Sequence, residues 1–148
     1  MYRNKLAVCL FVAAGITGPA QAGVPGIKDG AQLTREIAST VQDISTEALR
    51  REIDTNPELL LIDIRMPGEV MGMGGAIKAT QNVNIPRGWL EFQVTGHTPS
   101  KDTPIVVYCG GNIRSPLAAH TLKQMGYTNV RNYADGFLGW KQRGLPVE

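Results

Sequence analysis

The sequence is poor in the residues on which several classes of protein depend. Of its 148 residues, 2 are cysteine, 2 are histidine and 6 % are aromatic. No apolar run reaches the roughly 20 residues that a membrane-spanning helix needs, so we expect no such helix. The few cysteines and histidines do not stand at ligand spacing, so we expect neither a metal site nor a bound cofactor. The length and an apolar content of 43 % suit one globular domain.

The first 22 residues have the pattern of a cleaved signal peptide. Arg3 and Lys5 precede an apolar stretch at 6–16, and Ala20-Gln21-Ala22 provides small residues for cleavage. An uncleaved membrane anchor is the alternative, but the apolar stretch is short for a span. The sequence therefore predicts an exported protein, periplasmic if the source is a Gram-negative bacterium, with no membrane attachment after cleavage.

Cleavage changes both the charge and the cysteine count. Loss of Arg3 and Lys5 turns 15 basic residues against 13 acidic ones into 13 against 13. A net charge near zero gives no reason to expect nucleic acid or an anionic membrane as a partner. Cys9 leaves as well, so Cys109 is the only cysteine of the mature chain. A lone thiol in an oxidising compartment is exposed to damage, so its presence needs an explanation.

The hydrophobic pattern predicts an α/β domain at 43–148, preceded by an extension at 23–42 with a short helix at 31–40. Strands are expected at two continuous apolar runs, 59–62 and 105–108, with an edge strand at 41–45 and shorter strands at 82–86 and 130–133. Further helices are expected between them, at 46–54, 115–125 and 136–143, and a mobile loop at 71–75. Alternating strands and helices favour a mainly parallel sheet with helices on both faces.

The most informative stretch begins at Cys109, which directly follows the expected strand at 105–108. This position lies at the carboxyl end of the sheet, where α/β proteins bind ligands. Gly110, Gly111 and Asn112 all tolerate a left-handed backbone. Such a run can curl until its backbone N–H groups point inward and form a nest for an anion.

The residues after this run also favour a thiolate at Cys109. Ser115 can cap the next helix and Pro116 suits its first turn, so the helix dipole points into the loop. Arg114 adds a fixed positive charge that can pair with an oxyanion. A cysteine at the end of a buried strand is most often inert, but an inert cysteine needs none of these features. We therefore expect Cys109 to be reactive.

The segment 109–115 resembles the active-site loop of rhodaneses, in which a cysteine is followed by a glycine three positions later and by an arginine five positions later. Asn112 stands where that glycine is usual. Other segments resemble family signatures in the same order, namely 61–65 with Pro67 and Glu69, 84–86, and 126–147. Gly75-Ala76-Ile77 replaces the usual Gly-His-Ile, after a longer approach. The resemblance covers 43–148 and implies the rhodanese-like fold.

The resemblance also implies a function, that of a thiosulfate sulfurtransferase. Cys109 would take a sulfane sulfur from a donor such as thiosulfate as a persulfide, and cyanide, a small thiol or a protein thiol would accept it. The persulfide and donor would be held by the rest of the loop, that is Gly110, Gly111, Asn112, Ile113, Arg114 and Ser115.

Four polar residues outside the loop receive structural assignments. Asp63 and Arg65, at the end of the strand at 59–62, are expected to form a structural ion pair and not to take part in the chemistry. His97 is expected in a solvated loop and His120 on a helix surface.

Two other functions stay open. The first is a phosphatase or arsenate reductase of the related Cys-loop-Arg type, but those loops are generally one residue longer than this one. The shorter loop suits a sulfur atom better than a tetrahedral phosphate. The second is a non-enzymatic module that binds a protein partner, against which the intact Cys109 argues.

Overall fold

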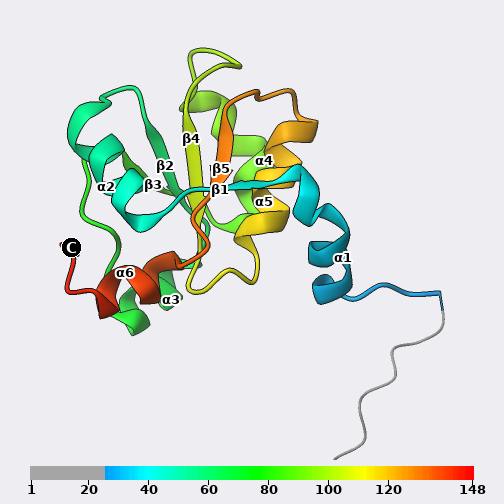
Figure 1. Ribbon diagram of the computed structural model, residues 1–148, viewed down its shortest axis with the longest axis horizontal. Coiled ribbons are helices and arrows are strands. Elements are labelled where there is room, and N and C mark those ends of the chain that lie inside the picture. Colours follow the sequence, from blue (N-terminus) through cyan, green and yellow to red (C-terminus); the bar gives the residue numbers. More distant parts are fainter. Residues whose placement is uncertain (1–25) are drawn as a thin grey trace, which may run out of the picture.

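The computed structural model describes residues 26–148, and Figure 1 shows their arrangement. The predicted signal peptide, with Cys9, lies outside the described residues. The helices are α1 Gly30–Ile37, α2 Thr46–Thr55, α3 Pro67–Met73, α4 Leu90–Gln93, α5 Ser115–Gln124 and α6 Gly136–Gln142. Short 3-10 turns are η1 Ala38–Thr40, η2 Arg87–Trp89 and η3 Val94–Gly96. The strands are β1 Gln42–Asp43, β2 Leu60–Asp63, β3 Asn82–Asn84, β4 Ile105–Tyr108 and β5 Val130–Asn132.

The five strands form one sheet in the order β1-β5-β4-β2-β3, and every pairing between them is parallel. All residues of β2 and β4 are buried, as continuous apolar runs predict. Asp63 pairs in register with Tyr108, so both central strands end at the same edge of the sheet. The expected fold class, a parallel sheet in an α/β domain, is confirmed.

Both faces of the sheet are covered by helices (Figure 1). On one face, Ile62 and Val107 share a core with Leu122 of α5. On the other face, Leu61 and Val106 share a core with α2 and α6. Alternate residues of each strand therefore serve opposite cores, because successive side chains point to opposite faces. Each fully buried Leu or Ile contributes roughly 1.5–3 kcal/mol.

The N-terminal extension lies against the domain. Asp29 caps α1 by accepting a hydrogen bond from the Gln32 N–H over 2.7 Å. The turn after α1 then contacts α5, where Thr40 Oγ1 lies 3.0 Å from His120 Nδ1. Lys123 Nζ donates to the Thr40 carbonyl over 2.7 Å. The extension is thus attached to the helix that begins at the Cys109 loop.

The structure corrects the expected loop at 71–75, because Met71 and Met73 belong to α3. Pro67 starts this helix, and the Glu69 carboxylate accepts a hydrogen bond from the Met66 N–H over 3.0 Å. Gly74 ends the helix with a left-handed φ of 87°. The helix depends on these terminal residues and not on the Met-Gly sequence within it. The short helix α4 is a second element that the sequence pattern did not predict.

Candidate active site

Cys109 follows β4 directly and is 1 % exposed. Its Sγ lies 3.5 Å from the hydroxyl of Ser115, the first residue of α5. The expectation that Ser115 caps this helix is therefore wrong. Arg114 occupies the cap position without a side-chain hydrogen bond, and the Ser115 hydroxyl turns to the sulfur instead. Pro116 lies in the first turn, as expected.

The backbone of the loop surrounds the Cys109 sulfur with hydrogen-bond donors. Burial by itself raises the pKa of the Cys109 thiol. Hydrogen bonds from the N–H groups of Arg114, Ser115 and Gly111, and from the Ser115 hydroxyl, act in the opposite direction. The net result is a pKa below the ordinary value, because these donors stabilise the thiolate more than burial disfavours it.

The left-handed backbone is confined to one residue of this loop. Asn112 has a φ of 59°, whereas neither Gly110 nor Gly111 has a positive φ. Of the three residues expected to tolerate a left-handed backbone, only Asn112 adopts it, at the place where the resemblance implies glycine. Ile113, next along the loop, is 77 % exposed and lies at the rim.

The start of α6 holds the other side of the loop. The Phe137 N–H donates to the Cys109 carbonyl over 2.8 Å, and the Leu138 N–H donates to the Gly110 carbonyl over 3.0 Å. Gly136 has a φ of 60°, and a Cβ there would lie 2.8 Å from the Cys109 carbonyl oxygen. A side chain at 136 cannot fit without moving the loop. The sequence placed Gly136 at the start of an expected helix and within the segment 126–147 that resembles a family signature, but it gave this residue no part in the site.

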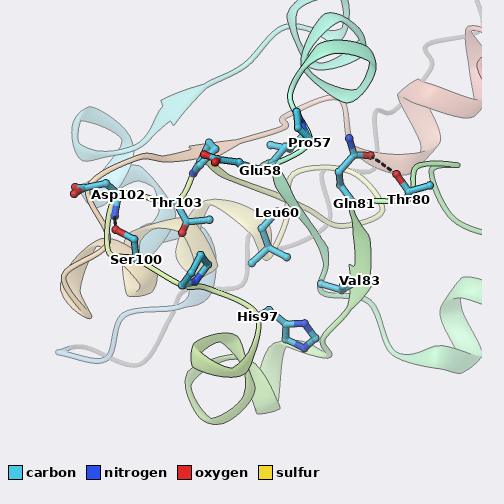
Figure 2. A pocket seen from close by; sticks show the side chains of 13 residues that line it. Pro57, Glu58, Leu60, Thr80, Gln81, Val83, His97, Ser100, Asp102 and Thr103 are labelled. Carbon is cyan, nitrogen blue, oxygen red and sulfur yellow. Dashed lines mark hydrogen bonds between the residues drawn. The ribbon is translucent and has the colours of Figure 1, made fainter.

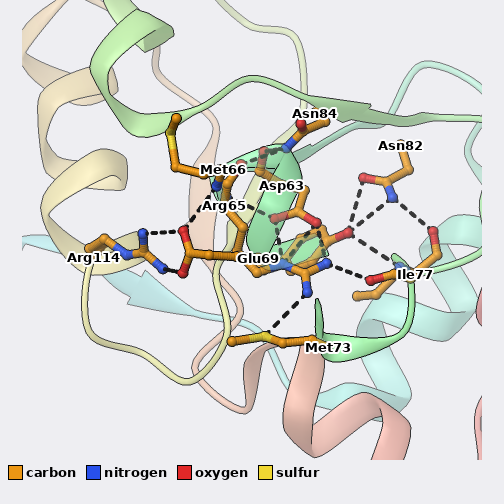
Figure 3. A network of polar contacts seen from close by, with 11 residues as sticks. Asp63, Arg65, Met66, Glu69, Met73, Ile77, Asn82, Asn84 and Arg114 are labelled. Carbon is orange, nitrogen blue, oxygen red and sulfur yellow. Dashed lines mark hydrogen bonds and ion pairs between the residues drawn. The ribbon is translucent and has the colours of Figure 1, made fainter. Parts of the chain in front are cut away.

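Asp63 and Arg65 form a fully buried ion pair (Figure 3), at the end of β2 where Asp63 pairs in register with Tyr108. Arg65 Nε donates to Asp63 Oδ1 over 2.9 Å, and Nη2 donates to Oδ2 over 2.5 Å. The same Nη2 reaches the Gly75 carbonyl, and the guanidinium lies 4.1 Å from the centre of the Phe137 ring. The pair thus joins β2 to the segment after α3 and to α6.

A second ion pair, between Arg114 and Glu69, lies at the rim of the site (Figure 3). Arg114 Nη1 donates to Glu69 Oε2 over 2.8 Å, and Nη2 donates to Oε1 over 2.6 Å. The hydrogen bonds from Arg114, followed by the one from the Met66 N–H, lower the pKa of Glu69 to about 2. Sequence reasoning placed Glu69 only within a signature, and its partner lies 45 residues away.

A hollow in the surface lies away from the Cys109 loop (Figure 2). It measures about 690 Å³ and is lined by Leu60, Pro104 and their neighbours, at the amino ends of the strands. His97 contributes to its wall, whereas no residue of the Cys109 loop does. Because Cys109 lies at the carboxyl end, this hollow is on the opposite edge of the sheet.

Within residues 26–148, no cluster of histidine, cysteine and acidic side chains is placed to bind a metal ion. None of the helices described there is long and apolar enough to cross a membrane.

Comparison with known proteins gives three kinds of similarity. Residues 45–143 match the family of rhodanese-like domains. A sulfurtransferase from Allochromatium vinosum is 33 % identical over 107 residues, which cover 72 % of this chain and 94 % of that protein. The polysulfide-sulfur transferase homodimer of Wolinella succinogenes has a TM-score of 0.69 at 27 % identity, covering 78 % of this chain and 84 % of the other. A Rhodopseudomonas palustris protein of unknown function, described as a possible tyrosine phosphatase, has a TM-score of 0.71 at 28 % identity, covering 88 % and 100 %.

Proposed function

Because the chain belongs to the rhodanese-like family, we propose that it is a sulfurtransferase that carries a sulfane sulfur as a persulfide on Cys109. The observation that carries this proposal is the convergence of N–H groups from Gly111, Arg114 and Ser115 on one buried sulfur. A thiolate and a terminal persulfide sulfur are both anions, and the same donors stabilise both.

The proposed first step uses thiosulfate as the donor. The Cys109 thiolate attacks the outer sulfur, a new S–S bond forms, and the S–S bond of thiosulfate breaks. Sulfite leaves with the electron pair of that bond. Arg114 borders the loop and presents a planar cation suited to the oxygens of thiosulfate or departing sulfite.

The proposed second step returns Cys109 to its thiolate. Cyanide or a thiolate acceptor attacks the outer sulfur of the persulfide, and the electron pair of the broken S–S bond returns to Cys109. The acceptor must be another molecule, because Cys109 is the only cysteine left once the predicted signal peptide, with Cys9, has been removed. Small thiols and protein thiols both meet this requirement. The signal peptide pattern supports export, so we place this exchange outside the cytoplasm.

A phosphatase is a poorer fit to the same loop. The loop has four residues between Cys109 and Arg114, which leaves less room than a tetrahedral phosphate needs.

Cyanolysis tests the proposal. The purified protein, given thiosulfate and cyanide, is expected to form thiocyanate, and Cys109→Ser is expected to form none above background. Mass spectrometry after treatment with thiosulfate alone should show one added sulfur on the wild-type protein and none on Cys109→Ser. Hydrolysis of an aryl phosphate without thiocyanate formation would establish the phosphatase instead. Inactivity in both assays, together with a stable protein complex, would establish a binding module.

A further inference from the structure

Asn112 is the point at which the Cys109 loop enters the left-handed region. Its φ is 59°, and no other non-glycine residue among 26–148 has a positive φ. A residue with a Cβ resists this backbone because the Cβ crowds a carbonyl oxygen. Asparagine resists it less than most residues, but such conformations persist where the surroundings impose them. Groups outside the loop must therefore hold Asn112.

Asn132, the last residue of β5, supplies such a hold. It is 1 % exposed, and its Nδ2 donates to Asn112 Oδ1 over 2.9 Å and to Asp43 Oδ1 over 2.7 Å. Both hydrogens of the amide are thus used. The reverse orientation of the amide would place its oxygen against two other oxygens, so the two acceptors determine how Asn132 lies.

These three residues, named here the Asn112 relay, come from separate parts of the chain. Asp43 lies in the edge strand β1, Asn132 in β5, and Asn112 in the loop between β4 and α5. Asp43 precedes residues 45–143, which match the family. A glycine at 112 has no side chain and needs no such partner. The relay is therefore needed only because residue 112 is asparagine in this chain.

The surroundings of the relay are open enough to tolerate truncation. A cavity of about 100 Å³ borders the three relay residues and is also lined by Thr34, Ala38, Val41 and Pro116. Asp43 itself is exposed. Removing a relay side chain therefore enlarges a hollow with mixed polar and apolar walls and removes no residue from the two apolar cores.

We propose that Asp43 and Asn132 are positioning residues that keep Asn112 left-handed and so keep the N–H groups of the loop directed at the Cys109 sulfur. The proposal rests on the proposed function for its significance, because the persulfide needs the same donors as the thiolate. If Asn112 relaxes to a negative φ, the neighbouring Gly111 N–H turns away from the sulfur. The thiolate then loses a donor, so the pKa of Cys109 rises and a smaller fraction of Cys109 is ionised at a given pH.

The test measures Cys109 directly, in the full chain. The rate of alkylation by iodoacetamide as a function of pH reports the thiolate, independently of sulfur transfer. We expect Asn132→Ala to move the midpoint upward by about one pH unit, a tenfold loss of thiolate at low pH. Asp43→Ala, at the exposed end of the relay, should move it in the same direction by less. Asn129→Ala and Asp54→Ala are matched surface controls that should leave the midpoint unchanged.

Repeating the measurement in an Asn112→Gly protein distinguishes a positioning role of Asn132 from a general destabilisation of the fold. In Asn112→Gly, the backbone at 112 reaches a positive φ without a side-chain partner, so adding Asn132→Ala should produce no further shift. An equal shift in both backgrounds overturns the proposal, as does an unchanged midpoint in Asp43→Ala and Asn132→Ala alike. If Asn132→Ala fails to fold, Asp43→Ala alone and with Asn112→Gly decides the outcome. A wild-type chain that alkylates readily but forms no thiocyanate contradicts sulfur transfer and leaves the relay standing.

Discussion

Two arginine–carboxylate pairs lie near Cys109 and differ mainly in burial. The side chains of Asp63 and Arg65 are both 0 % exposed, whereas those of Glu69 and Arg114 are 33 % and 37 % exposed. The hydrogen bonds within them are of similar length. The two pairs therefore have similar chemistry, and the access of water is the main difference between them.

Burial decides what each pair can do. A charge below the sheet edge has no water to replace a lost partner, so Asp63 and Arg65 must stay together. At the rim, water can solvate either charge when the pair opens, and the net cost of opening is small. Arg114 can thus exchange Glu69 for an anionic donor, as the proposed reaction requires. In the proposed reaction the buried pair supports the structure of the site, whereas Arg114 of the rim pair is available to bind the donor.

The largest expected effect comes from breaking the buried pair. Arg65→Ala leaves the Asp63 carboxylate buried without its partner and should lower the free energy of unfolding by about 3–5 kcal/mol. Urea unfolding measures the change. The double variant Asp63→Leu with Arg65→Met removes both charges and should recover much of the loss. A cost below about 1 kcal/mol for Arg65→Ala, as at a surface pair, would remove the contrast between the two pairs.

Truncating the rim arginine should affect activity and not stability. Arg114→Ala removes charge-assisted hydrogen bonds to the donor, so kcat/KM for thiosulfate should fall by about 10- to 100-fold. Unfolding free energy should change by less than about 1 kcal/mol. Arg114→Lys keeps the charge but not the bidentate geometry, so its kcat/KM should lie between those of the wild type and Arg114→Ala. A large loss of stability with unchanged kcat/KM would assign Arg114 a structural role.

The fold and the two ion pairs near Cys109 were only partly predictable from the sequence. The strands at 59–62 and 105–108 were predicted because continuous apolar runs have few other uses in a chain of this kind. Their shared edge placed Asp63 near Cys109, and the adjacency of Asp63 to Arg65 suggested the buried pair. Local pattern was sufficient wherever both partners lie within a few residues.

Contacts between segments far apart in the chain could not be predicted from the sequence. Glu69 and Arg114 lie 45 residues apart, and Asp43 and Asn132 lie 89 apart, so neither pairing leaves a local pattern. Ser115 was misassigned because a serine before a helix usually caps it, whereas here the cysteine sulfur lies against the hydroxyl. At α3, the weak helical pattern of the Met-Gly stretch concealed a helix that depends on Pro67 and Gly74.

Releasing Arg114 from Glu69 should change activity with thiosulfate by less than Arg114→Ala does, and in the opposite direction. Glu69→Gln keeps the size of the side chain but removes the charge that holds Arg114. A donor anion then meets less competition, so KM for thiosulfate should fall about two- to fivefold, because surface ion pairs are worth about 0.2–1 kcal/mol. Glu91→Gln, which removes the carboxylate paired with Arg87, is the matched control and should leave KM unchanged. A rise in KM for Glu69→Gln would show that Glu69 orients Arg114 and does not compete with the donor.

The smallest effect concerns pH. The pKa of Glu69 is lowered from its ordinary value of 4.5 to about 2, so the folded chain binds fewer protons at this site than the unfolded chain. Its contribution to stability is therefore complete above about pH 4.5 and is lost as the pH falls toward 2. Because a third of this side chain is exposed, solvent screening keeps that contribution below about 1 kcal/mol. Unfolding of the wild type and of Glu69→Gln, compared from pH 6 to pH 2, should show curves that converge as the pH falls. Curves that remain parallel would mean that the rim pair adds no stability, and the exchange of Glu69 for a donor would then be free of cost.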